Sequence, residues 1–288
     1  MRGVEILMQR ALKKHFALFL APTGAAFIIA FLLPFVIGLY LSFSSFTTIT
    51  DAKWVGLDNY KRAFEESQGF LGSFQFTLLV VIVAIVSVNI FAFAIARMLT
   101  QKLRGTNFFR SVFFMPNLIG GIVLGYTWQS MINAVLANYG TTIISKWEYG
   151  YIGLILLINW QQVGYMMIIY IAGLQSVPPE LVEAAEIDGA SRWQTLRHVT
   201  IPVIMPTITI CVFLTLSSTF KLYDQNLALT NGAPQSQTEM VALNIVNTMF
   251  SRIGQEGVGQ AKAVIFVIIV VALAVIQLRA TRSKEVEA

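Results

Sequence analysis

The sequence is poor in charged residues. Asp, Glu, Lys and Arg make up only 12% of its 288 residues, whereas 56% are hydrophobic. Soluble domains carry about 25% charged residues, so this composition excludes an ordinary water-soluble fold. The mean hydropathy of +0.68 instead indicates a chain that lies largely in a membrane.

Cysteine and histidine are nearly absent. The single cysteine, Cys211, excludes an internal disulfide and a thiolate metal cluster. Because Cys211 falls within a predicted span, we expect it to serve packing. The two histidines, His15 and His198, are far apart in sequence and belong to no zinc-protease helix motif. We therefore expect no metal site.

A phosphate-binding loop is missing as well. The glycine-rich segment 254–260 comes nearest, but Gln260 stands where such a loop needs a lysine. We therefore do not expect this chain to bind a nucleotide. Acidic residues are also missing from the predicted spans, apart from Asp224 at the edge of one, and this argues against proton coupling.

Long hydrophobic runs are what the sequence does contain. A helix needs roughly 20 apolar residues to cross the hydrocarbon core of a bilayer. Six runs near this length predict six transmembrane helices, so the expected fold class is an all-α polytopic membrane protein with one transmembrane domain, 1–288. The first run is too long for a cleaved signal peptide. The predicted spans are 16–43, 74–99, 111–132, 152–174, 203–223 and 263–278.

The basic residues predict the orientation. Lys and Arg gather in the cytoplasmic segments of membrane proteins. Here they gather in the N-terminal segment 1–15, between the second and third spans, and in the C-terminal tail, so we place both termini in the cytoplasm. The outer loops are then about 44–73, 133–151 and 224–262. Positive inner loops also explain the net charge of +5 without a nucleic-acid partner.

The connection between the fourth and fifth spans, about 177–202, predicts two short helices. Prolines open the first helix, a glycine ends it, a capping box opens the second, and a further proline closes it and opens the next span. Acidic residues and small alanines favour docking in a protein groove over lying on anionic lipid headgroups. The boundary residues are Pro178 and Pro179, Gly189, Ser191 with Gln194, and Pro202.

This connection also carries a family resemblance. Glu183, Ala184 and Ala185, followed by Gly189 and the run 199–202, resemble the EAA loop of permease subunits of binding-protein-dependent ABC importers. In that last run, Val and Ile stand where the family usually has Ile and Leu. Further stretches resemble the sugar-importer branch, that of the larger maltose-transporter permease, so the resemblance covers nearly the whole chain. These stretches are 54–60, 103–105, 113–116, 172–175 and 187–190.

The resemblance implies a type I ABC importer permease fold and several partners. The partners are a second six-helix permease, two copies of a cytoplasmic ATPase and an extracytoplasmic solute-binding protein, besides membrane lipid. ATP and magnesium would bind to the ATPase subunits, so the resemblance implies no cofactor and no catalytic residue in this chain. The implied location is the cytoplasmic membrane of a bacterium or archaeon. The implied ATPase-coupling residues are Glu183, Ala184, Ala185 and Gly189.

Polar residues inside the spans are candidates for a solute path, because they are costly in hydrocarbon unless they face a cavity or a partner. The fourth span contains Gln161, Gln162 and Tyr165, and amides beside an aromatic face suit sugar hydroxyls and sugar rings. In the resembling maltose permease, a sugar-contacting tyrosine matches Tyr165. The alternative is that such residues form hydrogen bonds between helices. The candidates of the fifth span, matched by position only, are Ser217, Ser218 and Lys221.

The sequence thus predicts a permease subunit that carries a sugar or oligosaccharide into the cell. Transport would proceed by alternating access, in which partner ATPases favour one of two conformations and the loop 177–202 transmits that bias. Two alternatives stay open. One is an importer of glycerol phosphate or another small solute in the same branch, and the other is an ion-coupled secondary transporter.

Overall fold

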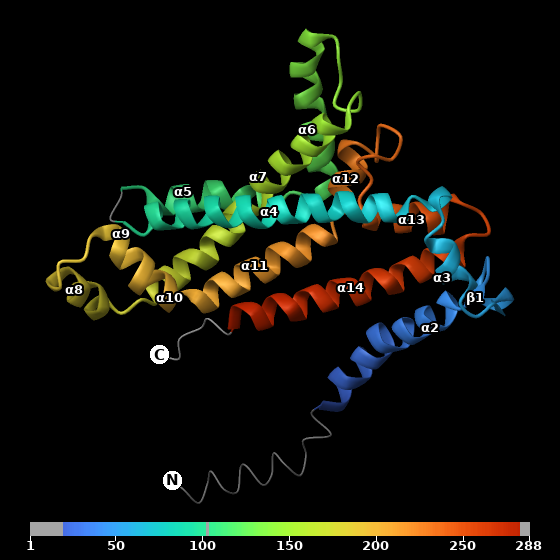
Figure 1. Ribbon diagram of the computed structural model, residues 1–288, viewed down its shortest axis with the longest axis horizontal. Helices are drawn as coiled ribbons and strands as arrows, with labels where there is room; N and C mark the ends of the chain where they lie inside the picture. Colours follow the sequence, from blue (N-terminus) through green and yellow to red (C-terminus); the bar gives the residue numbers. More distant parts are fainter. Residues whose placement is uncertain (1–19, 102–103, 283–288) are drawn as a thin grey trace, which may run out of the picture. The chain divides into compact units, whose positions relative to one another are not determined.

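The computed structural model describes residues 20–101 and 104–282 (Figure 1). The predicted N-terminal segment 1–15 and the last residues of the tail lie outside the described residues, so the cytoplasmic placement of the termini stays a prediction. Helices dominate the described residues, which confirms the all-α fold class.

The described chain divides into two compact units. The first comprises 20–63 and 248–264, and the second comprises 64–247 and 265–282. Two boundaries between the units fall inside helices α13 (Val241–Ser251) and α14 (Glu256–Arg282).

The first unit begins with a long apolar helix, Leu20–Ser42. It contains a π-helical turn, η1 (Ile28–Leu32), and continues as α2 (Leu33–Ser42). Large apolar side chains such as Ile29 are exposed along it, at 67% for this residue. A solvent-exposed apolar helix of this length is suited to lipid, so it corresponds to the predicted span 16–43.

A small hairpin follows this helix. Strands β1 (Ser44–Ser45) and β2 (Lys53–Trp54) pair antiparallel, with η2 (Ile49–Asp51) between them and α3 (Asp58–Ala63) after them. Hydrogen bonds from the Thr47 hydroxyl and from the backbone amides of Thr48 and Thr47 lower the pKa of Asp51 to about 2. They keep Asp51 ionised, so it holds the turn of the hairpin at neutral pH.

Buried contacts join the hairpin to the later segment of the same unit. The Asn59 amide donates to the carbonyls of Ser42 and Ser44, at 3.0 and 2.8 Å. Gly257, in the first turns of α14, lies so close that a Cβ there would come within 2.3 Å of the Ser44 carbonyl oxygen. Only glycine permits this approach.

Three long helices form the core of the second unit: α4 (Phe70–Leu99), α7 (Trp147–Gln175) and α11 (Met205–Phe220). Helix α4 packs along both α7 and α11 (Figure 1). Small residues of α4, such as Ala84 and Ala92, are fully buried in the same apolar cluster as Leu157 of α7. Small side chains let helix backbones approach closely where no hydrophobic effect drives them together.

The predicted third span, 111–132, is wrong as a single helix. The chain instead forms α5 (Thr106–Phe114) and η4 (Met115–Leu118), then turns by 100° into α6 (Gly121–Leu136). Pro116 lacks an amide hydrogen, and Gly120 takes a non-helical conformation with ψ 139°, so the helical hydrogen bonds are interrupted between them.

This broken span presses directly on α7. A Cβ at Gly164 would lie 1.8 Å from the Phe113 carbonyl oxygen, so no larger residue fits at Gly164. After α6, η5 (Ala137–Tyr139) leads to the segment before α7. The break is therefore fixed by tertiary contact as well as by local sequence.

The fifth span also meets a bend. The helical stretch Arg192–Val203 and the helix Met205–Phe220 meet at 71°. With each bent pair counted as one span, the described residues hold up to six candidate spans, and four without them. The predicted six spans agree with the larger count.

The predicted outer loop 224–262 is largely helical. It contains α12 (Asp224–Leu229), α13 and the first turns of α14, while η3 (Glu66–Gln68) lies in the predicted outer loop 44–73. A turn at Asn231 and Gly232 follows α12, with φ of 47° and 81°. Helix α12 packs closely on α6, since a Cβ at Gly125 would lie 2.5 Å from that of Ala228.

Candidate functional site

A polar cavity of about 280 Å³ lies where α7, α11, α12 and η4 come together. Its walls come from segments far apart in sequence, and polar side chains predominate. Of the predicted solute-path residues, all except Ser217, which is half-buried, line it. The lining residues are Asn117, Gln161, Gln162, Tyr165, Met166, Leu214, Ser218, Lys221, Leu222 and Gln225.

Two buried amides of α7 form one wall of this polar cavity. The Gln162 Oε1 atom accepts a hydrogen bond from the Ser218 hydroxyl at 3.0 Å, and the Gln161 Oε1 atom accepts one from the Gln225 amide at 2.8 Å. Each amide is therefore held in one orientation by a residue of another helix. With its carbonyl engaged, each amide offers its NH2 group as a donor to a ligand.

Tyr165 and Lys221 supply the remaining chemistry of the cavity. Tyr165 stands one helical turn after Gln161 and is 38% exposed, so its ring face and hydroxyl are available to a ligand. Lys221 ends α11 and is the one charged residue among those that line the cavity. Donors, an aromatic face and a cation together suit a solute rich in hydroxyl or other acceptor oxygens.

Other polar residues of the spans bridge helices instead. Asn159 donates to the Ser87 hydroxyl at 2.9 Å, and the Tyr170 hydroxyl donates to the Asn89 amide oxygen at 2.8 Å. These pairs join α7 to α4 and do not line the polar cavity. Asn159 and Tyr170 therefore bridge helices, whereas Gln161 and Gln162 both bridge helices and line the polar cavity.

Asn117 and Gln225 line the cavity but were not among the predicted path residues. Asn117 lies in η4, inside the break of the third span, and a Pro-Asn pair in an apolar run was a usable signal for it. Gln225 lies beyond the predicted end of the fifth span. It reaches the cavity because α12 folds back against α6, a tertiary contact that no local pattern announces.

The predicted pair of short helices after α7 is present. They are α8 (Pro179–Ile187) and α9 (Arg192–Thr195), and the second continues through η6 (Leu196–Thr200) and α10 (Ile201–Val203). Gly189 has φ of 79°, a left-handed conformation that terminates α8, and the Ala190 amide donates back to the Ala185 carbonyl at 2.9 Å.

The capping box of α9 is confirmed. The Ser191 amide donates to the Gln194 side chain at 2.8 Å, and the Gln194 amide donates to the Ser191 hydroxyl at 3.4 Å. The predicted boundary at Pro202 is close to the observed one, since the helical stretch from Arg192 ends at Val203, breaks at Ile204, and the next helix begins at Met205.

The coupling residues predicted by resemblance lie at the surface of α8. Glu183, Ala184 and Gly189 are exposed, and Ala185 is half-buried. Two large apolar side chains beside them are strongly exposed, Ile187 at 87% and Trp193 at 65%. Exposed apolar side chains on a compact helix pair are typical of a docking surface.

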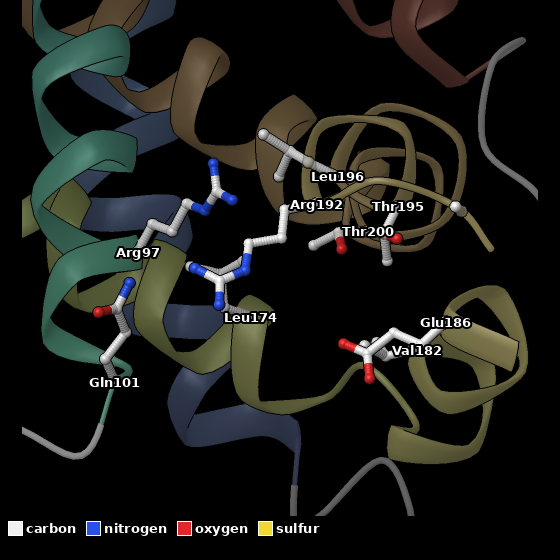
Figure 2. A pocket seen from close by; sticks show the side chains of 10 residues that line it. Arg97, Gln101, Leu174, Val182, Glu186, Arg192, Thr195, Leu196 and Thr200 are labelled. Atoms are coloured by element: carbon white, nitrogen blue, oxygen red, sulfur yellow. The ribbon is translucent and has the colours of Figure 1, made fainter.

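A second cavity, of about 540 Å³, lies behind these helices. Figure 2 shows Arg97 of α4 and Arg192 of α9 reaching into it, with Glu186 of α8 facing them. Leu174, in the last turn of α7, lines the same cavity. The end of α7, the short helices and the end of α4 thus surround one space.

In the described residues, no three His, Cys, Asp or Glu side chains come together to hold a metal ion. Cys211 is buried against the Met166 carbonyl at 4.0 Å and is not paired. Both findings apply to residues 20–101 and 104–282, which the structure describes.

Comparison with known proteins gives consistent matches. The family model for the inner membrane component of binding-protein-dependent transport systems matches residues 106–283. The chain is 42% identical over 279 residues to a probable starch degradation products transport system permease protein, AmyD of Thermoanaerobacterium thermosulfurigenes, and the match covers 94% of each chain. It is 31% identical over 269 residues to the multiple sugar-binding transport system permease protein MsmF of Streptococcus mutans, over 90% of this chain and 92% of the other.

A solved structure also shares the fold. A chain in the crystal structure of a bacterial ABC transporter involved in the import of the acidic polysaccharide alginate matches with a TM-score of 0.80 at 20% identity. The match covers 96% of this chain and 98% of the other.

Proposed function

Because the chain belongs to the family of inner membrane components of binding-protein-dependent transport systems, we propose that it is the permease subunit through which an oligosaccharide enters the cell. Members of this family are transport components and not enzymes, and the chain is a multi-pass membrane protein. The ion-coupled secondary transporter, the more distant alternative, is excluded by this membership.

The observation that carries the proposal is the connection between the polar cavity and the coupling helices. Helix α7 contributes Gln161, Gln162 and Tyr165 to the cavity, and its end leads within a few residues into α8. A rigid helix transmits a displacement of one end to the other. A movement of α8 therefore changes the position of the side chains that hold the solute.

The proposal includes the partners. The exposed face of α8 and α9 docks on a cytoplasmic ATPase, of which two copies bind and hydrolyse ATP with magnesium. A second six-helix permease completes the path, and an extracytoplasmic solute-binding protein delivers the solute. The complex lies in the cytoplasmic membrane of a bacterium or archaeon. Names of relatives that concern starch products and multiple sugars support an oligosaccharide as the solute.

A second candidate solute is a small phosphate ester such as glycerol phosphate. Lys221, the charged residue of the polar cavity, favours an anionic solute. The buried amides and Tyr165 instead form a larger hydrogen-bonding surface that needs no anion. Uptake of labelled maltotriose and of labelled glycerol 3-phosphate by the same complex separates the two candidates.

Co-purification and uptake together test the proposal. The tagged wild type, expressed with its neighbouring genes, is expected to bring along an ATPase and a second permease in gentle detergent. In Glu183→Lys, the reversed charge on the exposed face of α8 is expected to release the ATPase and to reduce maltotriose uptake by about 90% or more. Glu148→Lys, an equally exposed acid in the first turn of α7, is the matched control and should change neither result.

Two outcomes contradict the proposal. A wild type that purifies without an ATPase would remove the coupling role of α8. A wild-type complex that hydrolyses ATP but takes up neither solute would remove the permease role of the polar cavity.

A further inference from the structure

A third cavity lies away from both sites described above, at the start of α4 and α7. Its volume is about 450 Å³, and we name it the Trp147 hollow. The loop between α12 and α13 forms its other wall, so all of its residues belong to the second unit. The lining residues are Gly69, Gly72, Ser73, Trp147, Gln235, Ser236 and Gln237.

The hollow owes its depth to a missing side chain. A Cβ built on Gly72 meets nothing within 4 Å, so a larger side chain there would extend into open space. Gly69 differs, because its φ of 61° requires glycine for the turn from η3 into α4. Nothing in the packing requires glycine at Gly72, and its effect is to leave room beside Trp147.

The loop wall holds an energetically unfavourable backbone. Gln235 and Ser236 have φ of 49° and 62°, in the left-handed region that residues other than glycine seldom adopt. Both side chains are exposed, at the surface of the hollow. Backbone strain of this kind persists only where surrounding contacts enforce it, and it concentrates at binding sites.

Buried hydrogen bonds beneath the loop supply that enforcement. The Thr238 hydroxyl donates to the Ala233 carbonyl at 2.7 Å, and the Asn226 amide donates to the Thr238 carbonyl at 2.8 Å. The Met240 amide in turn donates to the Asn226 side chain at 2.9 Å. The loop is therefore fixed on its buried side, and it presents residues 235–237 in one geometry.

A buried carboxylate ties the loop to the opposite wall. Glu239 is 4% exposed, and its carboxylate accepts hydrogen bonds from Asn244 at 2.9 Å and from Asn247 at 2.7 Å. The Ser73 hydroxyl donates to the same carboxylate at 3.5 Å. Ser73 and the loop thus keep a fixed separation across the hollow.

The chemistry of the lining is that of a carbohydrate site. The indole of Trp147 is 37% exposed and is braced by Tyr151, with ring centroids 6.1 Å apart. The amides of Gln235 and Gln237 offer both donors and acceptors, as the hydroxyls of a sugar require. No side chain that lines the hollow is charged, which favours a neutral solute over an anion. The volume falls within the range of small-molecule sites.

We propose that the Trp147 hollow is a second carbohydrate subsite, in which a sugar ring stacks on Trp147 while Gln235 and Gln237 bind its hydroxyls. This inference rests on the proposed function, since it assumes that the solute is an oligosaccharide. Because the hollow lies on the predicted outer side of the membrane, it would hold the sugar before the sugar reaches the polar cavity.

Photolabelling of the complete importer tests the subsite directly. The complex in nanodiscs, without the solute-binding protein, is irradiated with an azidophenyl maltoside, and the labelled residues are located by tandem mass spectrometry. We expect label at Trp147 or within 235–237, and we expect excess maltotriose to compete with it. Gly72→Leu fills the hollow and Trp147→Ala removes the ring, so each should reduce this label about five-fold or more.

Matched variants control for folding. Trp147→Phe keeps an aromatic face and should retain most of the label. Gly24→Leu also places a large side chain at a glycine with nothing within 4 Å, but far from the hollow in sequence, and should retain all of it. Label confined to Gln161, Tyr165 and their immediate neighbours, or label that maltotriose does not displace, overturns the subsite.

A docking role for the hollow is the competing explanation. If Trp147→Ala weakens binding of the solute-binding protein by more than about five-fold and leaves the label unchanged, the hollow is a protein contact and the subsite is overturned. Failure of the two proposals is distinguishable. Normal uptake with an unlabelled hollow removes the subsite alone, whereas absence of sugar uptake by the wild type removes the proposed function as well.

Discussion

The polar cavity and the coupling helices differ in the exposure of their side chains. In the cavity, Gln161 and Gln162 are buried and each carbonyl already has a partner within the chain. On the coupling helices, Ile187 and Trp193 are exposed and lie on a surface that the described residues do not cover. On the proposed function, a small solute would meet groups that are already oriented, whereas the exposed surface of α8 and α9 would be covered by the ATPase. Changes in the cavity should therefore affect solute affinity, and changes at the coupling helices should affect the link to ATP hydrolysis.

The largest expected effect is a loss of coupling to ATP hydrolysis, with the polar cavity unchanged. Gly189→Val forces a β-branched residue into φ of 79°, which costs about 1–2 kcal/mol and should displace the end of α8. ATP-driven maltotriose uptake in proteoliposomes is expected to fall about ten-fold, because 1.4 kcal/mol corresponds to a factor of ten. Gly189→Asn is the control, since asparagine tolerates this conformation and should retain most uptake. Equal losses in both variants would show that the bend is not what matters.

A ten-fold change is also expected on the cavity side, but in affinity and not in turnover. Gln162→Ala removes a buried amide, and the loss of one or two hydrogen bonds to the solute should raise the half-saturating solute concentration about ten-fold. Ser217→Ala is its matched partner, because Ser217 does not line the cavity and should change this concentration less than two-fold. A large effect of Ser217→Ala would show that the path runs along a different face of α11.

The smallest expected effect is a change in solute affinity when Gln225, which holds Gln161 in place, is replaced. Gln225→Leu leaves the Gln161 carbonyl without its partner, so the Gln161 amide loses its fixed orientation. A positioning residue of this kind should raise the half-saturating solute concentration about three-fold, with ATPase stimulation unchanged. Gln225→Glu preserves the length but not the donor and should resemble Gln225→Leu. If Gln225→Glu behaved as the wild type, hydrogen bonding to Gln161 would not be the role of Gln225.

The two regions also differ in how far the sequence predicted them. The coupling helices depend on local interactions, and local patterns identified the Ser191 and Gln194 capping box and the left-handed Gly189 correctly. The end of the second helix was placed one residue early, since the helical stretch runs on to Val203 and breaks at Ile204.

The cavity depends on tertiary contacts, and the prediction was incomplete there. Residues on α7 and α11 were found because polar groups are rare in apolar runs. The break between Pro116 and Gly120 was missed, since proline is tolerated in membrane helices and hydropathy averages over it. Gln225 was missed because its placement depends on the approach of α12 to Gly125 of α6.

The break in the third span has a consequence for how the solute sheds its hydration shell. The first amide groups of α6 have no intrahelical acceptor, and Gly121 at the start of α6 lies against Gln225, which lines the polar cavity. Backbone groups at this depth are tolerated only where protein or water meets them. On the proposed function, a sugar that enters the cavity would exchange part of its bound water for hydrogen bonds to these amide groups. The broken helix would thereby lower the cost of dehydrating the solute.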